Sequence, residues 1–138
     1  MGKKDVVEIL KNGKSVQIHP MGNSMMPFIY PGRDEVVISP MYKELRKYDI
    51  ILFRSKETGV LTLHRIVDID GKMYYVCGDN QYRLEPVDKE QVLGVVTEII
   101  RKGKRINTEA PVYRSLAKLY TKNKHTFNVL RKLRNRSQ

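Results

Sequence analysis

Short runs of β-branched, aromatic and other apolar residues, separated by turn-forming residues, cover the chain from Ser15 to Arg101. Valine, isoleucine and aromatic side chains favour strands, and the intervening Gly, Pro, Asp and Asn favour turns. This pattern predicts a mainly β domain, a compact and mostly antiparallel structure. The predicted strands are Val16–Ile18, Glu35–Ser39, Ile50–Arg54, Val60–Ile69, Met73–Cys77 and Val92–Arg101.

The dipeptide Asp70-Gly71 separates two of these runs and predicts a β-hairpin. A type I′ turn needs a positive φ at both of its central residues, and Asp-Gly is a preferred pair for them. Before the strands, apolar residues between Val6 and Leu10 lie within a charged stretch that ends at Asn12-Gly13. They predict a short N-terminal helix of one or two turns.

The pattern changes again after Arg101. A loop from Lys102 to Ala110 leads to Pro111, a favoured first residue of a helix. Apolar residues then recur at helical spacing, which predicts one basic amphipathic helix or two helices interrupted near residues 122–124. These residues are Val112, Leu116, Leu119, Tyr120, Phe127, Leu130 and Leu133.

Charge divides the chain in the same place. Residues 1–100 hold 14 basic and 14 acidic side chains, whereas residues 101–138 hold 12 basic side chains and the single acid Glu109. With 138 residues, the chain is long enough for one domain with a modest core. We therefore treat residues 1–101 as a neutral β body and residues 102–138 as a basic helical tail.

Composition excludes several classes of protein. The single cysteine, Cys77, excludes an intramolecular disulfide framework, and with three scattered histidines it argues against a structural metal site. The longest uncharged run, Ser15 to Gly32, contains three prolines and does not suit a membrane span, and Met1 to Leu10 lack the apolar core of a signal peptide. The expected location is the cytoplasm or the periphery of a membrane, and no cofactor is expected.

The densest chemical signal is the segment Gly22 to Pro27, Gly-Asn-Ser-Met-Met-Pro. A serine among these residues lies on tightly bent backbone, where its hydroxyl projects and nearby amides converge. Serine needs a base to become a nucleophile. Of the three histidines only His64 lies within a predicted strand, so it is the candidate base for Ser24. The competing interpretations are a simple Gly-Ser turn and a partly buried strand histidine.

A catalytic histidine also needs an acid that holds its ring. The candidates are Asp79 in Gly78-Asp79-Asn80 and, after it, Glu85 and Asp88. A plain turn and a solvated loop are the alternative interpretations of these acids.

Taken in order, these segments resemble the signal peptidase I family and its relatives among serine peptidases. The match spans roughly Val16 to Ile100, and it is closest to the branch that uses histidine in place of a lysine base, including small relatives without a membrane anchor. The motifs that carry it are Gly22 to Pro27, Tyr48 to Phe53, His64-Arg65-Ile66-Val67 and Gly78-Asp79-Asn80.

The resemblance implies a barrel-like signal-peptidase or repressor-peptidase fold and a serine endopeptidase that cleaves a leader or exported peptide. Ser24 would be the nucleophile, His64 the general base, and the Ser24 amide part of the oxyanion hole. Glu85 is the first choice for the orienting acid, then Asp79, then Asp88. Cleavage would fall as His64 gains a proton, near its ordinary pKa of about 6.5.

The chain departs from the family at Gly22, where many members carry a serine that assists the oxyanion. The Asn23 side chain or a backbone amide is the candidate substitute. Met25, Met26 and Phe28 beside Ser24 are either substrate-groove or core residues. The resemblance favours the groove.

The tail has three candidate roles. Its cations and apolar residues suit the surface of an anionic membrane. Its apolar face is equally suited to packing on the body, and nucleic acid is the weakest candidate because no base-reading motif accompanies the cations.

Two other functions compete with the peptidase. One is a noncatalytic β-barrel binding module that uses the tail for a membrane or an acidic partner. The other is a self-cleaving repressor of the related SOS-response family, which ranks last because those proteins use lysine as base and carry an N-terminal DNA-binding domain.

Overall fold

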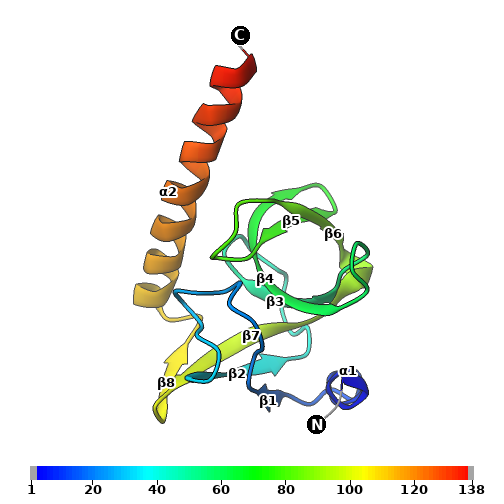
Figure 1. The fold of residues 1–138 in the computed structure, drawn as a ribbon. Coiled ribbons are helices and arrows are strands. Elements are labelled where there is room, and N and C mark those ends of the chain that lie inside the picture. The colour runs from blue at the N-terminus through cyan, green and yellow to red at the C-terminus, as the bar shows by residue number, and fades with distance from the viewer. Residues whose placement is uncertain (1–2, 137–138) are drawn as a thin grey trace.

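A computed structural model describes the backbone of residues 3–136 and the side chains of residues 5–125. Helices stand at the two ends of the chain and strands lie between them (Figure 1). The elements are α1 (Lys3–Lys11), β1 (Val16–Ile18), β2 (Asp34–Ser39), β3 (Ile50–Arg54), β4 (Leu61–Asp70), β5 (Met73–Cys77), β6 (Glu85–Asp88), the 3-10 helix η1 (Lys89–Gln91), β7 (Val92–Arg101), β8 (Lys104–Asn107) and α2 (Pro111–Arg136).

All pairings in the eight-stranded sheet are antiparallel, which confirms the mainly β prediction. The strand order is β1-β2-β7-β3-β4-β5-β6, with β8 paired to β7 beside this path. The end strands β1 and β6 do not pair with each other, so the sheet is not closed. The six predicted strands are present, each within one residue of its predicted ends.

Strands β6 and β8 were not predicted, because both are short and rich in charged or polar residues. The segment that forms β8 was predicted as a loop, but the positive φ of Lys102 and Gly103 turns the chain back so that β8 pairs with β7. Strand β6 carries Pro86 and lies at an edge of the sheet, where a missing backbone donor is tolerated. The sheet therefore extends six residues past the predicted end of the body.

The predicted hairpin joins β4 and β5, with one difference in its turn. Asp70 pairs with Met73, so the central residues are Gly71 and Lys72 and not Asp70 and Gly71. Of these two only Gly71 has a positive φ, so the turn is not type I′. The predicted β-hairpin is confirmed, but its turn lies one residue later in the chain than predicted, because Asp70 belongs to the strand pair.

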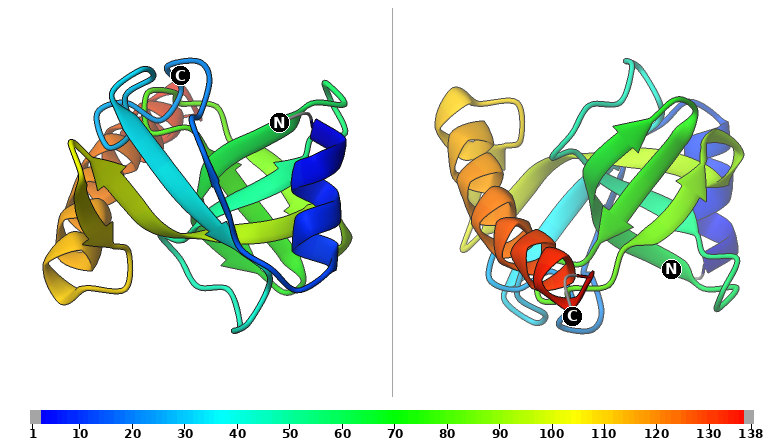
Figure 2. Two further views of the ribbon diagram at one scale, coloured as in Figure 1. Left: turned by 90° about the horizontal axis from the view of Figure 1, so that it is seen from below. Right: turned by 90° about the horizontal axis from the view of Figure 1, so that it is seen from above.

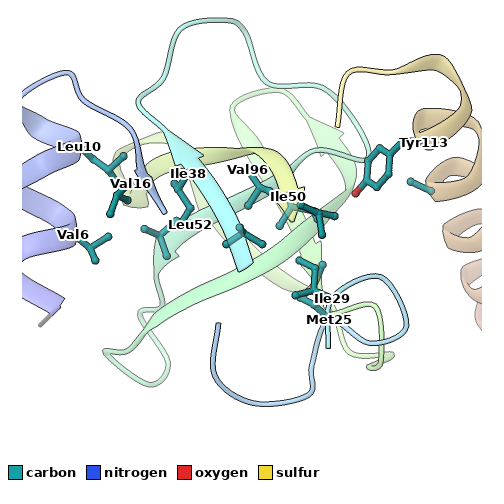
Figure 3. Packing of buried hydrophobic residues seen from close by; sticks show 13 residues of the cluster. Val6, Leu10, Val16, Met25, Ile29, Ile38, Ile50, Leu52, Val96 and Tyr113 are labelled. Carbon is teal, nitrogen blue, oxygen red and sulfur yellow. The ribbon is translucent and has the colours of Figure 1, made fainter. Parts of the chain in front are cut away.

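Buried apolar residues form two clusters. One lies between β3, β4, β5 and β6 and contains Phe53, Ile66 and Val87. The other joins the two helices to β2, β3 and β7 and to the loop that carries Met25 and Ile29 (Figure 3). This second cluster fixes the position of the loop that contains Ser24.

The helices lie on opposite sides of the sheet (Figure 2). α2 is one continuous helix from Pro111, which excludes the predicted alternative of two helices. It packs on the body through Tyr113 and Ala117, which are both buried. No helix within the described residues is long and apolar enough to cross a membrane.

Candidate active site

Ser24 lies in the long loop between β1 and β2, on a series of turns, and is half-buried. The far end of this loop is held by the buried Asp34 carboxylate, which accepts hydrogen bonds from the Tyr30 amide at 2.8 Å and from the guanidinium groups of Arg33 and Arg101. Burial alone would raise the pKa of Asp34, but these donors lower it to about 2. The segment Gly32-Arg33-Asp34 thus anchors the loop.

The near end of the loop packs on the turn that follows β5. The Asn80 amide donates to the Ser24 carbonyl at 2.8 Å, and the Asn80 side chain donates to the Asn23 carbonyl at 3.3 Å. Gly78 has no room for a side chain, because a Cβ there would lie 2.6 Å from the Ser24 carbonyl oxygen and 3.1 Å from the Ser24 Cβ. The Gly-Asp-Asn turn is therefore a support on which Ser24 rests.

Gly78→Ala is expected to displace the Ser24 loop, because the added Cβ meets backbone and cannot be avoided by a rotamer change. Gly59→Ala, outside this loop, is the matched control for the loss of a glycine: its positive φ strains the alanine, but open space surrounds it. We expect amide hydrogen exchange of residues 22–26 to rise strongly in the Gly78 variant alone. Unchanged exchange at Ser24 in that variant would contradict the role of Gly78.

His64 faces the same region from β4. Its neighbour Arg65 pairs with Cys77, the last residue of β5 before the Gly-Asp-Asn turn, and the charge of Asp79 in that turn acts on His64. A Cβ on Gly78 would meet Ser24, so the same turn also supports Ser24. The fold thereby brings both predicted catalytic residues to the neighbourhood of this turn.

The His64 ring is 9% exposed, and its Nδ1 atom is buried without a hydrogen-bond partner. Burial lowers the pKa of His64 to about 4; nearby Asp79 opposes this shift and Lys124 adds to it. Among the described residues, no hydrogen bond joins the Ser24 hydroxyl to His64. The ring is thus held neutral, as a proton acceptor must be.

The low pKa of His64 predicts a pH-dependent stability. Above about pH 6.5 the ring is neutral in both folded and unfolded chains, and between about pH 6.5 and 4 only the unfolded chain binds the proton. The free energy of unfolding should therefore fall by about 3 kcal/mol over this range. Urea unfolding at several pH values measures it.

His64→Gln should remove most of that decrease, and His19→Gln, at an exposed histidine, should leave it in place. The decrease that remains in the His64 variant should include a part from His125, whose pKa burial also lowers. Equal pH slopes in the wild-type chain and the His64 variant would show that His64 titrates normally in the folded state.

The candidate acids have other partners. Both oxygens of the Asp79 carboxylate accept from Arg65, from Nε and Nη2, each at 2.8 Å. Glu85 accepts from the Ser55 hydroxyl at 2.7 Å, and Asp88 accepts from Lys56 and caps η1. The structure brings none of the three into hydrogen-bond contact with the His64 ring. Of the three, only Asp79 acts on the His64 charge.

Sequence reasoning missed Arg65, which is fully buried beside the site. Besides Asp79, its guanidinium donates from Nη1 to the Tyr48 carbonyl at 2.8 Å and to the Tyr113 hydroxyl at 3.2 Å. The Phe28 ring packs against the same group, 4.8 Å from its carbon atom. Arg65 thus ties β4 to the Gly-Asp-Asn turn and to α2. The available signal was an arginine in the middle of the most apolar strand.

Helix α2 also reaches this turn. The Tyr120 hydroxyl donates to the Asp79 carbonyl at 2.7 Å, and Lys124 Nζ donates to the Gly78 and Asp79 carbonyls at 2.9 and 3.0 Å. Lys124 is half-buried, and this burial lowers its pKa. The tail residues closest to the candidate site were not predicted, since only the apolar spacing of the tail was visible in the sequence.

The predicted oxyanion and substrate residues differ in their surroundings. Met25 is buried in the second core cluster, and Phe28 packs against that cluster with Tyr113 and Tyr120 edge-on to its ring. These contacts favour the core interpretation for both, whereas Met26 is only half-buried. Gly22 has a φ of +79° beside open space, and Asn23 is exposed. Within the described part of the chain, the Ser24 amide donates no hydrogen bond.

The described residues contain no cluster of three or more His, Cys, Asp or Glu side chains that suits a metal ion. Comparison of the sequence with models of protein families gives no match, and comparison with curated proteins gives none either.

Proposed function

We propose that this protein is a serine endopeptidase of the signal-peptidase type, with the β strands arranged as that barrel-like fold. The observation that carries the proposal is the turn after β5: its Gly78 lies against Ser24, and the charge of its Asp79 acts on His64. A structural turn has no need of a neutral buried histidine close to the serine loop that it supports. A nucleophile and its base do.

In the proposed mechanism, His64 removes the proton of the Ser24 hydroxyl as the oxygen attacks the peptide carbonyl. The tetrahedral oxyanion accepts a hydrogen bond from the free Ser24 amide. His64 then gives the proton to the leaving amine, and water hydrolyses the acyl-enzyme with His64 again as base. The substrate class is a leader or exported peptide cut after a small residue, as the resemblance implies.

The acid of this mechanism acts without a direct bond. Asp79 is held by Arg65 and stabilises a charged His64 ring electrostatically, since it raises the pKa that burial lowers. We therefore propose a Ser24–His64 dyad and not a triad with Glu85. Because the pKa of His64 is about 4, the loss of base at low pH should occur near that value and not at the ordinary 6.5.

The test is digestion of a peptide mixture prepared from a whole proteome, with mass spectrometry of the new termini. The wild-type chain should produce termini at small residues, and Ser24→Ala should produce none. Ser15→Ala, at an exposed serine, is the matched control and should cleave like the wild type. New termini that persist in Ser24→Ala would exclude this mechanism, and their absence with the wild type would favour the noncatalytic binding module.

A further inference from the structure

Three large apolar side chains lie exposed along the outer side of α2. Val112, Leu116 and Leu119 are 74%, 55% and 60% exposed. Their spacings of four and three residues place them on one face of the helix. We call these three residues the outer stripe. Apolar side chains gathered on one exposed face are a feature of contact surfaces.

The opposite face of α2 already has its partner. Tyr113, Ala117 and Thr121 are buried against the body, and Lys124 bonds to the turn after β5. The outer stripe consequently lies away from the face that packs on the body. This arrangement decides against the prediction that Leu116 and Leu119 pack on the body. Tyr120, the third residue of that alternative, does pack on the body against Phe28, and Phe127, the fourth, lies outside the described side chains.

Positive charge accompanies the outer stripe. Lys122, three residues after Leu119, borders the outer stripe, and Lys118 lies one turn before Lys122 on the same side of the helix. Both are exposed, and within the described part of the chain neither forms an ion pair. In the sequence, residues 101–138 carry 12 basic side chains and one acid, Glu109. That acid is bound to Lys43 and Arg46 of the body. The surface is thus apolar and cationic together.

The apolar and cationic character of this surface discriminates between three possible partners: a second copy of the chain, nucleic acid and a lipid bilayer. A second copy of α2 would bring like charges together, at a formal net charge of +11 for each chain. Nucleic acid would be bound by the cations, but it gives leucine side chains nothing to bury in. The boundary between lipid headgroups and acyl chains accommodates both kinds of side chain, because apolar side chains insert there while cations contact the anionic headgroups.

We propose that α2 lies flat on an anionic lipid bilayer, with the outer stripe inserted at the headgroup boundary and Lys118 and Lys122 at the lipid phosphates. Since α2 also holds the Gly78–Asp79 turn, the docked helix would keep the candidate active site beside the membrane surface. This docking goes beyond the proposed function and does not depend on it.

The experiment is cosedimentation of the full chain with vesicles of phosphatidylcholine containing about 30% phosphatidylglycerol, in about 0.1 M salt. Leu116→Gln with Leu119→Gln should weaken binding about tenfold or more, because two apolar anchors are lost. Lys118→Gln with Lys122→Gln should weaken it by a similar factor. Pure phosphatidylcholine vesicles should bind the wild type weakly.

Met41→Gln with Val60→Gln is the matched control, since both residues are exposed apolar side chains outside α2. This pair and Ser24→Ala should bind as the wild type, so vesicle binding and cleavage are measured separately. The proposal is overturned if the Leu116 and Leu119 pair binds unchanged. It is also overturned if the wild type binds no vesicles. In that case, a dimer in light scattering that the leucine changes dissociate would identify a second copy as the occupant. Oligonucleotide binding that depends on the lysines alone would identify nucleic acid.

Discussion

Replacement of His64 by glutamine should lower the rate of peptide cleavage by about 10³-fold or more, as much as replacement of Ser24 by alanine. Serine hydroxyls are weak nucleophiles without a base. Without His64 the Ser24 hydroxyl stays protonated, so the serine then contributes little to the rate of cleavage. The measurement is the cleavage rate of one peptide identified in the proteome mixture, with each variant at several enzyme concentrations.

The double variant provides the stricter test. Ser24→Ala combined with His64→Gln should be no slower than either single variant, because two residues that act as a unit do not give additive losses. Rates that multiply would mean that the two residues act independently. Glu85→Gln is the control for the acid: its partner is Ser55, so cleavage should stay close to the wild-type rate. A loss equal to that of His64→Gln would restore Glu85 as the orienting acid.

Asp79→Asn should reduce the free energy of unfolding by about 3–5 kcal/mol, a large share of the total for a domain of this size. The change removes the charge that compensates Arg65, which is 0% exposed, while Asp79 itself is 2% exposed. A guanidinium left in the core without its carboxylate is strongly destabilising. Urea unfolding at pH 7 measures the difference.

Two further variants show whether the effect belongs to the buried pair. Arg65→Met with Asp79→Leu should be less destabilising than Asp79→Asn, because both charges are removed together. Arg83→Met breaks the exposed pair with Glu57, and it should change the free energy of unfolding by less than about 1 kcal/mol. If Asp79→Asn were as mild as Arg83→Met, Arg65 would not depend on this carboxylate for its burial.

The sheet was largely predictable because alternation and turn residues act locally. β-branched runs gave six strands nearly to the residue, and Pro111 marked the start of α2. The exceptions were β6 and β8, whose residues have little preference for strands. Each becomes a strand because an adjacent strand offers free backbone groups, and such pairing depends on residues distant in the sequence.

The candidate site divides in the same way. The sequence by itself determined its chemistry: Ser24 on bent backbone, His64 within a strand and an excess of cations after residue 100. It also marked the candidate acids for the histidine. It did not decide among them, since nothing local distinguishes one loop carboxylate from another.

Only the tertiary structure decided the partners. Arg65 donates hydrogen bonds to the Asp79 carboxylate, and the Ser55 hydroxyl donates to Glu85. The pKa of His64 falls because the histidine is buried. The same holds for α2, where spacing predicted an apolar face but packing determined that Tyr113 turns inward and Leu116 outward. Side-chain identity and local spacing are properties of the sequence. Burial and pairing arise only when segments far apart in the chain meet, and these set the charge of each group.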